Sequence, residues 1–121
     1  ATHLLASLRL QAQGAAIAVT AFDMPVLEAG LYKVTYFARI TRAASTSSQL
    51  NVNVVFTDGA IVCTMDGAAI AGNTTATVES ESFLVRIDRA TTIRYSTTYA
   101  SVGATTMQYG VDFVVESVPV N

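Results

Sequence analysis

Hydrophobic and polar residues alternate along much of this 121-residue chain. The clearest run covers residues 31–41, where every second side chain is apolar: Tyr32, Val34, Tyr36, Ala38 and Ile40. The positions between them are mostly polar, although Leu31 and Phe37 lie among them. Because side chains on a β-strand switch faces at every residue, this pattern predicts a strand with one buried and one largely solvated face.

Comparable segments recur along the rest of the chain, and turn residues separate them. Asp58 and Gly59 predict a tight hairpin turn, because both residue types tolerate a positive φ. The predicted strands cover residues 3–13, 15–22, 31–41, 49–57, 60–65, 76–88, 93–99 and 107–116. No helix-length period interrupts them. Short strands at this spacing predict an all-β fold, a two-sheet antiparallel jelly-roll sandwich of about eight strands, as a single domain over residues 1–121.

The last two predicted strands form the most regular pair. Their apolar positions are Ile93, Tyr95, Thr97 and Tyr99 in the first, and Met107, Tyr109, Val111, Phe113 and Val115 in the second. A short loop of small residues separates them, which predicts an antiparallel hairpin. Residues 79–82 (Glu-Ser-Glu-Ser) are expected to hold an exposed bend or bulge before the regular pattern resumes at Phe83.

The chain carries unusually little charge for its apolar content. Charged residues make up 13% and hydrophobic residues 51% of it, whereas soluble domains have roughly 25% charged residues. Too few charges are present to coat a freely exposed monomer. Part of the apolar surface is therefore expected to be covered by copies of the chain or by a partner.

The same composition weighs against two kinds of partner. The net charge is −2 and the basic residues are scattered, whereas nucleic-acid binding needs a concentrated positive field. No stretch approaches the roughly 18 uninterrupted apolar residues of a membrane-spanning helix. We therefore expect neither nucleic-acid binding nor membrane insertion.

Candidate catalytic and metal-binding residues are sparse, and no enzymatic activity and no cofactor is expected. His3 is the only histidine, whereas a metal or acid–base site needs several convergent groups. The acidic residues are not paired in the pattern that a glycosidase uses. Calcium is the metal alternative, because Asp58, Asp66 or Asp112 offers oxygen ligands, although no calcium-loop pattern is present. Cys63, the only cysteine, is expected to be a buried, unreactive thiol.

Three segments carry a resemblance to known families. Residues 30–36 (GLYKVTY), followed much later by residues 83–89 (FLVRIDR), are similar to strands of the jelly rolls in the tumour-necrosis-factor and complement globular-head superfamily. Residues 95–109 (YSTTYASVGATTMQY) resemble small structural proteins encoded by tailed bacteriophages. The resemblance covers about residues 30–116. The chain lacks the tryptophan-rich early strand and the disulfide of the eukaryotic signalling members, which argues against a cytokine role.

The resemblance implies a homotrimeric structural component of a bacteriophage virion: a capsid decoration or head-fibre protein that binds the major capsid protein or other virion proteins. A symmetric trimer would also cover the apolar surplus. The aromatic-rich closing segment is the expected contact between copies, and its candidate residues are Tyr95, Tyr99, Met107, Tyr109 and Phe113. The pattern leaves open which of them face a neighbouring copy and which face the core.

Two other functions stay open at this point. The chain is alternatively the receptor-binding head of a tail-fibre adhesin, with the loops 42–48, 68–75 and 100–106 recognising a glycan on the host surface. A hydrolytic enzyme is the third possibility, and the absence of an acid–base pair in the sequence argues against it.

Overall fold

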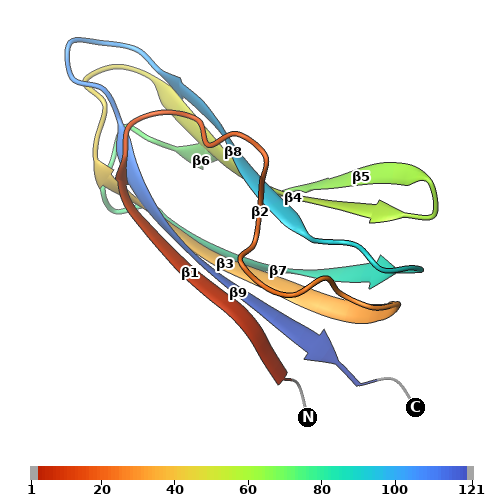
Figure 1. Cartoon of the computed structure of the whole chain (residues 1–121). Coiled ribbons are helices and arrows are strands. Elements are labelled where there is room, and N and C mark those ends of the chain that lie inside the picture. Colours follow the sequence, from red (N-terminus) through yellow and green to blue (C-terminus); the bar gives the residue numbers. More distant parts are fainter. Residues whose placement is uncertain (1–2, 120–121) are drawn as a thin grey trace.

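The structure, a computed structural model, describes residues 3–119, and these residues form two packed antiparallel sheets (Figure 1). The strands are β1 (His3–Gln13), β2 (Thr20–Ala21), β3 (Gly30–Arg42), β4 (Ser48–Asp58), β5 (Ile61–Asp66), β6 (Ile70–Ala71), β7 (Val78–Ile87), β8 (Arg94–Ser101) and β9 (Gln108–Val118). Sheet A has the order β1-β9-β3-β7. Sheet B has the order β2-β8-β4-β5, and the short β6 pairs with β4.

The strand order is that of a jelly roll, because the chain passes between the two sheets from β1 to β4 and again from β7 to β9. The predicted fold class is therefore confirmed. Residues 3–119 contain nine strands, compared with about eight predicted. Two of the nine, β2 and β6, contain only two residues each. The strand predicted over residues 15–22 is reduced to Thr20–Ala21. Most of that segment crosses from sheet A to sheet B without joining a ladder.

Two local predictions were wrong. Strands β8 and β9 do not form a hairpin: β8 lies in sheet B and β9 in sheet A, and their apolar sides face each other across the sandwich. Alternation marks each strand but does not say whether two apolar faces lie side by side or opposite each other. The bend expected at residues 79–82 is also absent, because all ten residues of β7 pair with β3 without a register shift.

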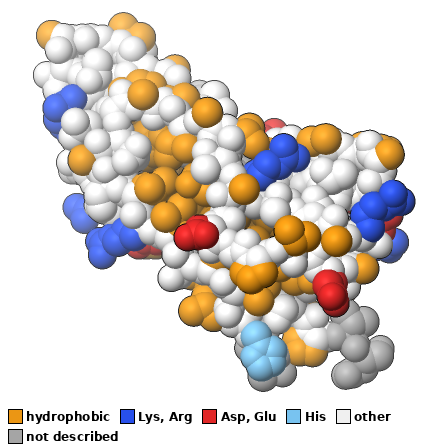
Figure 2. Space-filling view, in the orientation of Figure 1, with side chains coloured by type: hydrophobic (Ala, Val, Ile, Leu, Met, Phe, Trp, Pro, Cys, Tyr) orange, Lys and Arg blue, Asp and Glu red, His pale blue; other side chains and the backbone are white. Residues whose placement is uncertain are grey.

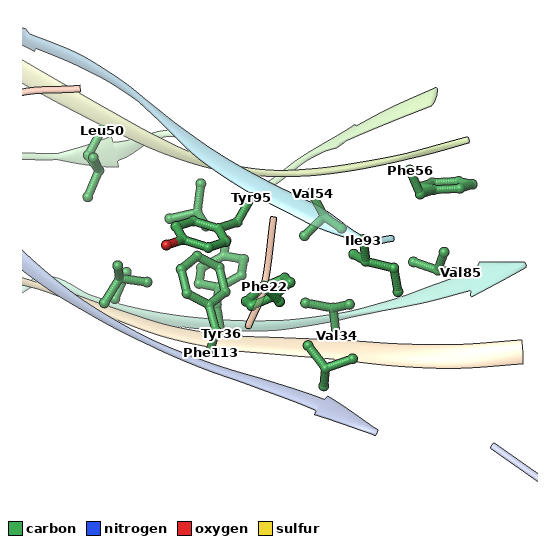
Figure 3. Close-up of a cluster of buried hydrophobic side chains, with 14 of the residues drawn as sticks. Phe22, Val34, Tyr36, Leu50, Val54, Phe56, Val85, Ile93, Tyr95 and Phe113 are labelled. Atoms are coloured by element: carbon green, nitrogen blue, oxygen red, sulfur yellow. The ribbon is translucent and has the colours of Figure 1, made fainter. Parts of the chain in front are cut away.

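The core lies between the two sheets. The predicted apolar faces of β3 and β4 are buried, and Tyr36, Leu50 and Val54 have no exposed surface. An aromatic cluster joins the layers near the middle (Figure 3): the ring centroid of Phe113 lies 5.0 Å from that of Tyr95 and 5.4 Å from that of Phe22. Aromatic pairs at these separations add about 0.5–1.5 kcal/mol each beyond the burial of their area.

A buried tyrosine hydroxyl closes each open side of the sandwich. On the side of β1 and β2, the Tyr109 hydroxyl lies 2.6 Å from Oγ1 of Thr97 and donates to the carbonyl oxygen of Ala15 at 2.7 Å. On the side of β5 and β7, the Tyr36 hydroxyl lies 2.5 Å from Oε1 of Glu79 and 2.9 Å from Oε2 of Glu81. Both hydroxyls satisfy polar groups at the margin of an apolar core.

Candidate functional site

The residues predicted to join copies of the chain lie together, but inside a single copy. Met107 and Tyr109 have no exposed surface, Phe113 has 1% exposed and Tyr95 has 7%. Tyr99 is partly buried and donates from its hydroxyl to the carbonyl oxygen of Met107 at 2.7 Å.

This placement corrects the interface prediction for four of the five residues. The apolar side chains of β8 and β9 point into the space between the sheets, where the opposite sheet covers them. Only Tyr99 retains surface that a neighbouring copy can contact. The sequence shows the apolar face of each strand, but it does not show whether that face lies against the second sheet or against a neighbouring copy.

The three loops predicted to recognise a receptor meet at one end of the sandwich (Figure 1). The amide of Ala44 donates to the carbonyl oxygen of Gly72 at 2.9 Å, which joins the first loop to the second. The amide of Ser45 donates to the carbonyl oxygen of Thr105 at 3.0 Å, which joins the first to the third. Arg42 adds a bond from Nε to the carbonyl oxygen of Thr106 at 2.9 Å.

This loop end is rich in hydroxyl groups and nearly uncharged. Arg42 is the one charged residue in the three loops, and no aromatic residue occurs in them. Several of these hydroxyl groups form hydrogen bonds within and between the loops. For example, Oγ of Ser45 accepts a hydrogen bond from the amide of Thr105 at 3.1 Å. Chemically, the end offers a firm polar surface for contact with another protein. It has no ring on which a sugar could stack.

A shallow hollow on the outer face of sheet A has chemistry that the sequence analysis missed. It lies over Gly110, near the start of β9, and its other lining residues are Arg9, Gln11, Phe37, Arg39, Thr41 and Asp112. The Phe37 side chain is 46% exposed. The hollow thus suits a ligand that carries a carboxylate and an apolar face. It offers two guanidinium groups, an amide, a hydroxyl and an exposed aromatic ring.

Asp112 is the acidic member of this hollow. Its Oδ1 is buried and lies 3.5 Å from Nε of Arg9, and it accepts no hydrogen bond from residues 3–119. A glycine inside a predicted strand signals a close approach of a ligand or of another chain segment. Gly110 was therefore the signal by which the sequence could have indicated this hollow.

The acidic residues show one close pair, which the sequence analysis placed in an exposed bend. Glu79 and Glu81 continue the inward-facing positions of β7 and meet at the Tyr36 hydroxyl. Glu81 also accepts from the backbone amide of Ala68 at 3.2 Å. Neither carboxylate lines the hollow over Gly110, and their arrangement serves to fasten the connection after β5 to β7.

The remaining candidate residues are dispersed. Asp58 and Asp66 end β4 and β5, whereas Asp112 lies in the opposite sheet. Within residues 3–119, no three His, Cys, Asp or Glu side chains are grouped as a metal site would require. Cys63 is only partly buried on β5, contrary to the expectation of full burial. His3 is exposed at the start of β1. No helix in the described part of the chain is long and apolar enough to cross a membrane.

Comparisons with known proteins find similarity to a chain of a virus structure. No family model matches the chain, and no curated protein matches it. A chain from a solved structure of infectious bursal disease virus, Gt strain, is similar with a TM-score of 0.54 at 14% sequence identity. The similarity covers 97% of the present chain but 33% of the viral chain. At this identity it shows a shared fold.

Proposed function

We propose that this protein is a structural component of a virus particle, and more specifically a homotrimeric capsid decoration or head-fibre protein of a tailed bacteriophage. The observation that carries the proposal is the fold similarity to the infectious bursal disease virus chain, which extends over 97% of the present chain. The bacteriophage assignment rests on the resemblance of residues 95–109 to phage structural proteins. The major capsid protein is the expected partner, and the virion the expected location.

The distribution of charge supports a role in an assembly and indicates which outer face of the sandwich contacts another copy. The outer face of sheet A carries charged side chains on all four strands: Arg9, Lys33, Arg39, Arg86, Asp112 and Glu116. The outer face of sheet B is uncharged along the middle of β4 and β8, where its side chains are Gln49, Asn51, Asn53, Ser96 and Thr98. Gln49 and Thr98 are exposed on this face, whereas Asn53 and Ser96 are buried beneath it. Protein interfaces are depleted of charge at their centres. The outer face of sheet B is therefore the proposed contact between copies.

Side-chain hydrogen bonds make this face a fixed surface. Nδ2 of Asn53 donates to Oγ1 of Thr98 at 3.1 Å and lies 3.4 Å from Oγ of Ser96. Nε2 of Gln49 donates to Oδ1 of Asn51 at 3.0 Å. A surface whose polar groups already satisfy one another loses little on being covered. Figure 2, which views the sandwich from the side, shows exposed hydrophobic side chains along the middle of the molecule, with charged side chains scattered around them.

Two measurements test the proposal. Purified particles should contain the protein in hundreds of copies, as determined by quantitative mass spectrometry, and the isolated protein should have the mass of a trimer by light scattering. Thr98→Arg, on the outer face of sheet B, should reduce the trimer to smaller species. Thr35→Arg, at an equivalent position on sheet A, is the matched control and should leave the mass unchanged. Absence of the protein from purified particles would refute the structural role. A monomeric mass at all concentrations would refute the trimer.

The hollow over Gly110 favours a second candidate function, the adhesin head that recognises a host glycan. The exposed ring of Phe37 can stack on a sugar, and Arg39 or Arg9 can pair with a sugar carboxylate. This candidate places recognition on sheet A rather than on the loop end. Binding of glucuronic acid should exceed that of glucose in calorimetry. It should be lost in Gly110→Val, whose side chain fills the hollow, and retained in Arg86→Gln on the same outer face. Equal binding of both sugars would exclude an acidic-glycan site here.

A further inference from the structure

The edges of the two sheets differ in how they are protected against pairing with another strand. Sheet A ends at β1 and β7. Sheet B ends at β2 and at β5, and the two-residue β6 continues the β5 edge along another stretch of β4. An edge strand presents unpaired backbone N–H and C=O groups, and proteins protect such edges with bulges, short strands or inward-pointing charges. Three of the four edges carry one of these devices.

The three protected edges use different devices. Strand β1 has register shifts between Leu4 and Ala6 and between Leu10 and Gln13, which interrupt its ladder. Strand β2 has two residues and is too short to act as a template. Strand β7 carries the inward-pointing acid pair at Glu79 and Glu81, which the Tyr36 hydroxyl holds in place.

The fourth edge, β5, carries none of these features. It pairs with β4 without a register shift, and no charge occurs in it before its last residue, Asp66. Ile61 is 69% exposed and Val62 is 62% exposed. Figure 1 shows β5 at the margin of its sheet, with no strand on its far side. A regular, apolar and exposed edge of this kind is a template for strand addition.

We propose that β5 of a second copy pairs antiparallel with this edge about a two-fold axis that passes beside Cys63. The two copies of sheet B then form one continuous sheet. The self-complementarity of β5 selects a second copy as the occupant. The inference stands on the strand edge itself and does not require the proposed function; if the protein is a trimer, the same pairing joins two trimers.

The register follows from the faces of the strand and from its length. Cys63 and Met65 pair with Phe56 and Val54 of β4, whose side chains are buried in the core, so the odd-numbered residues of β5 face inward. Residues opposite each other in an antiparallel pair share a face. Only registers that join odd with odd positions therefore keep both inward faces continuous.

Among these registers, the one centred on Cys63 fits best. It sets Ile61 opposite Met65 of the second copy, Val62 opposite Thr64, and Cys63 opposite Cys63, so that the whole apolar segment is used. A register centred on Val62 would pair only residues 61–63 of the two strands, because residues 64–66 of each copy would extend past Ile61, where the partner chain turns back into β4. A register centred on Thr64 would leave Ile61 beyond the end of the partner strand, opposite Gly67.

Sedimentation equilibrium tests the occupant. The wild-type protein should associate reversibly so that its mass doubles with rising concentration. Val62→Lys places a charge on the open edge, and its association constant should fall at least tenfold. Leu84→Lys is the matched control, because Leu84 is similarly exposed, at 58%, but lies on the outer face of β7. No doubling up to millimolar concentration, or equal association of wild type and Val62→Lys, would overturn the proposal.

A thiol cross-linker tests the register. Cys63 is the only cysteine, so a short bismaleimide can produce a covalent dimer only through Cys63 of both copies. The cross-linked species should form in the wild type and in Leu84→Lys, and should be lost in Val62→Lys. Doubling of the mass without this cross-link would refute the register centred on Cys63. These outcomes do not depend on whether the protein is found in virus particles, so failure here and failure of the proposed function are distinguishable.

Discussion

The two open sides of the sandwich solve the same structural problem with different chemistry. Each is closed by a tyrosine of sheet A that has no exposed surface, Tyr109 beside β1 and β2 and Tyr36 beside β5 and β7. Both tyrosines fill core volume with a ring and place a hydroxyl at the margin. Tyr109 meets neutral partners, whereas Tyr36 meets two carboxylates. The comparison separates the contribution of burial from that of charge within one fold.

On the neutral side the hydrogen bonds run in one direction. The amide of Ile17 donates to Oγ1 of Thr97 at 2.8 Å. Tyr109 uses its single hydrogen for the carbonyl oxygen of Ala15. The hydrogen between Thr97 and Tyr109 must therefore come from Thr97. This relay ties the crossing segment after β1 to the core through neutral groups alone.

On the charged side there are more acceptors than hydrogens. The Tyr36 hydroxyl has one hydrogen and two carboxylate oxygens within 2.9 Å, so it can serve one carboxylate at a time. The bond from Tyr36, followed by that from the amide of Ala68, holds the pKa of Glu81 below its usual range. Burial raises the pKa of Tyr36 above its usual range, and the two carboxylates raise it further. Tyr36 thus remains a donor and Glu81 an acceptor at neutral pH.

The largest effect is expected from Tyr36→Phe at neutral pH. The ring is retained, but two half-buried carboxylates lose their shared donor. A hydrogen bond to a charged group contributes about 1.5–3 kcal/mol, so unfolding free energy should fall by about 2 kcal/mol. Urea denaturation followed by circular dichroism measures this value. A loss well under about 1 kcal/mol would mean that water replaces the hydroxyl at the half-exposed acid pair.

Tyr109→Phe should cost less, about 1 kcal/mol, because its hydroxyl bonds only to neutral partners. The same denaturation experiment applies, and Thr97→Val provides a double-mutant cycle that isolates the contact between the two side chains. Thr97 is 4% exposed and therefore more deeply buried than the acid pair. If Tyr109→Phe proved more damaging than Tyr36→Phe, depth of burial would outweigh charge in closing this sandwich.

The sequence predicted the strands and their inward faces better than it predicted which strands pair with each other. Alternation correctly gave the inward faces of β3 and β4, because a period of two follows directly from strand geometry. It could not say that β8 and β9 belong to different sheets, since pairing depends on contacts between segments far apart in the chain. Tyr109 and Phe113, two of the candidate contact residues, therefore proved to face the second sheet, which the alternation of one strand could not reveal.

At Glu79 and Glu81 the alternation of β7 was the correct guide, and the charge of the two residues was misleading. Glu79 and Glu81 have the same parity as Phe83 and Val85, so extending the period of two backward places them on the inner face. Their charge suggested an exposed bend instead. The hydroxyl that makes their position tolerable belongs to Tyr36, 43 residues from Glu79 in sequence, and no local pattern reveals such a partner. The hollow over Gly110 was missed for a similar reason, since its lining comes from three strands.

Acidification should change the charged side and leave the neutral side unaffected, although the effect is smaller than either loss of a hydroxyl. Because the folded-state pKa of Glu81 is lowered, its stabilising contribution is present above the unfolded-state pKa and is lost as the pH falls through the folded-state value. The cost of Tyr36→Phe should therefore shrink between pH 7 and the acid range, whereas that of Tyr109→Phe should stay constant.

Glu81→Gln identifies the group responsible for this pH dependence. The amide oxygen can still accept hydrogen bonds from Tyr36 and from Ala68, but it does not titrate, so the stability of this variant should fall less on acidification than that of the wild type. Asp23→Asn, which removes an exposed acid outside the strands, is the control and should follow the wild-type curve. Urea midpoints measured from pH 7 downward give both curves. If Glu81→Gln lost as much stability as the wild type, acid sensitivity would arise elsewhere, and the two sides would differ in hydrogen-bond strength alone.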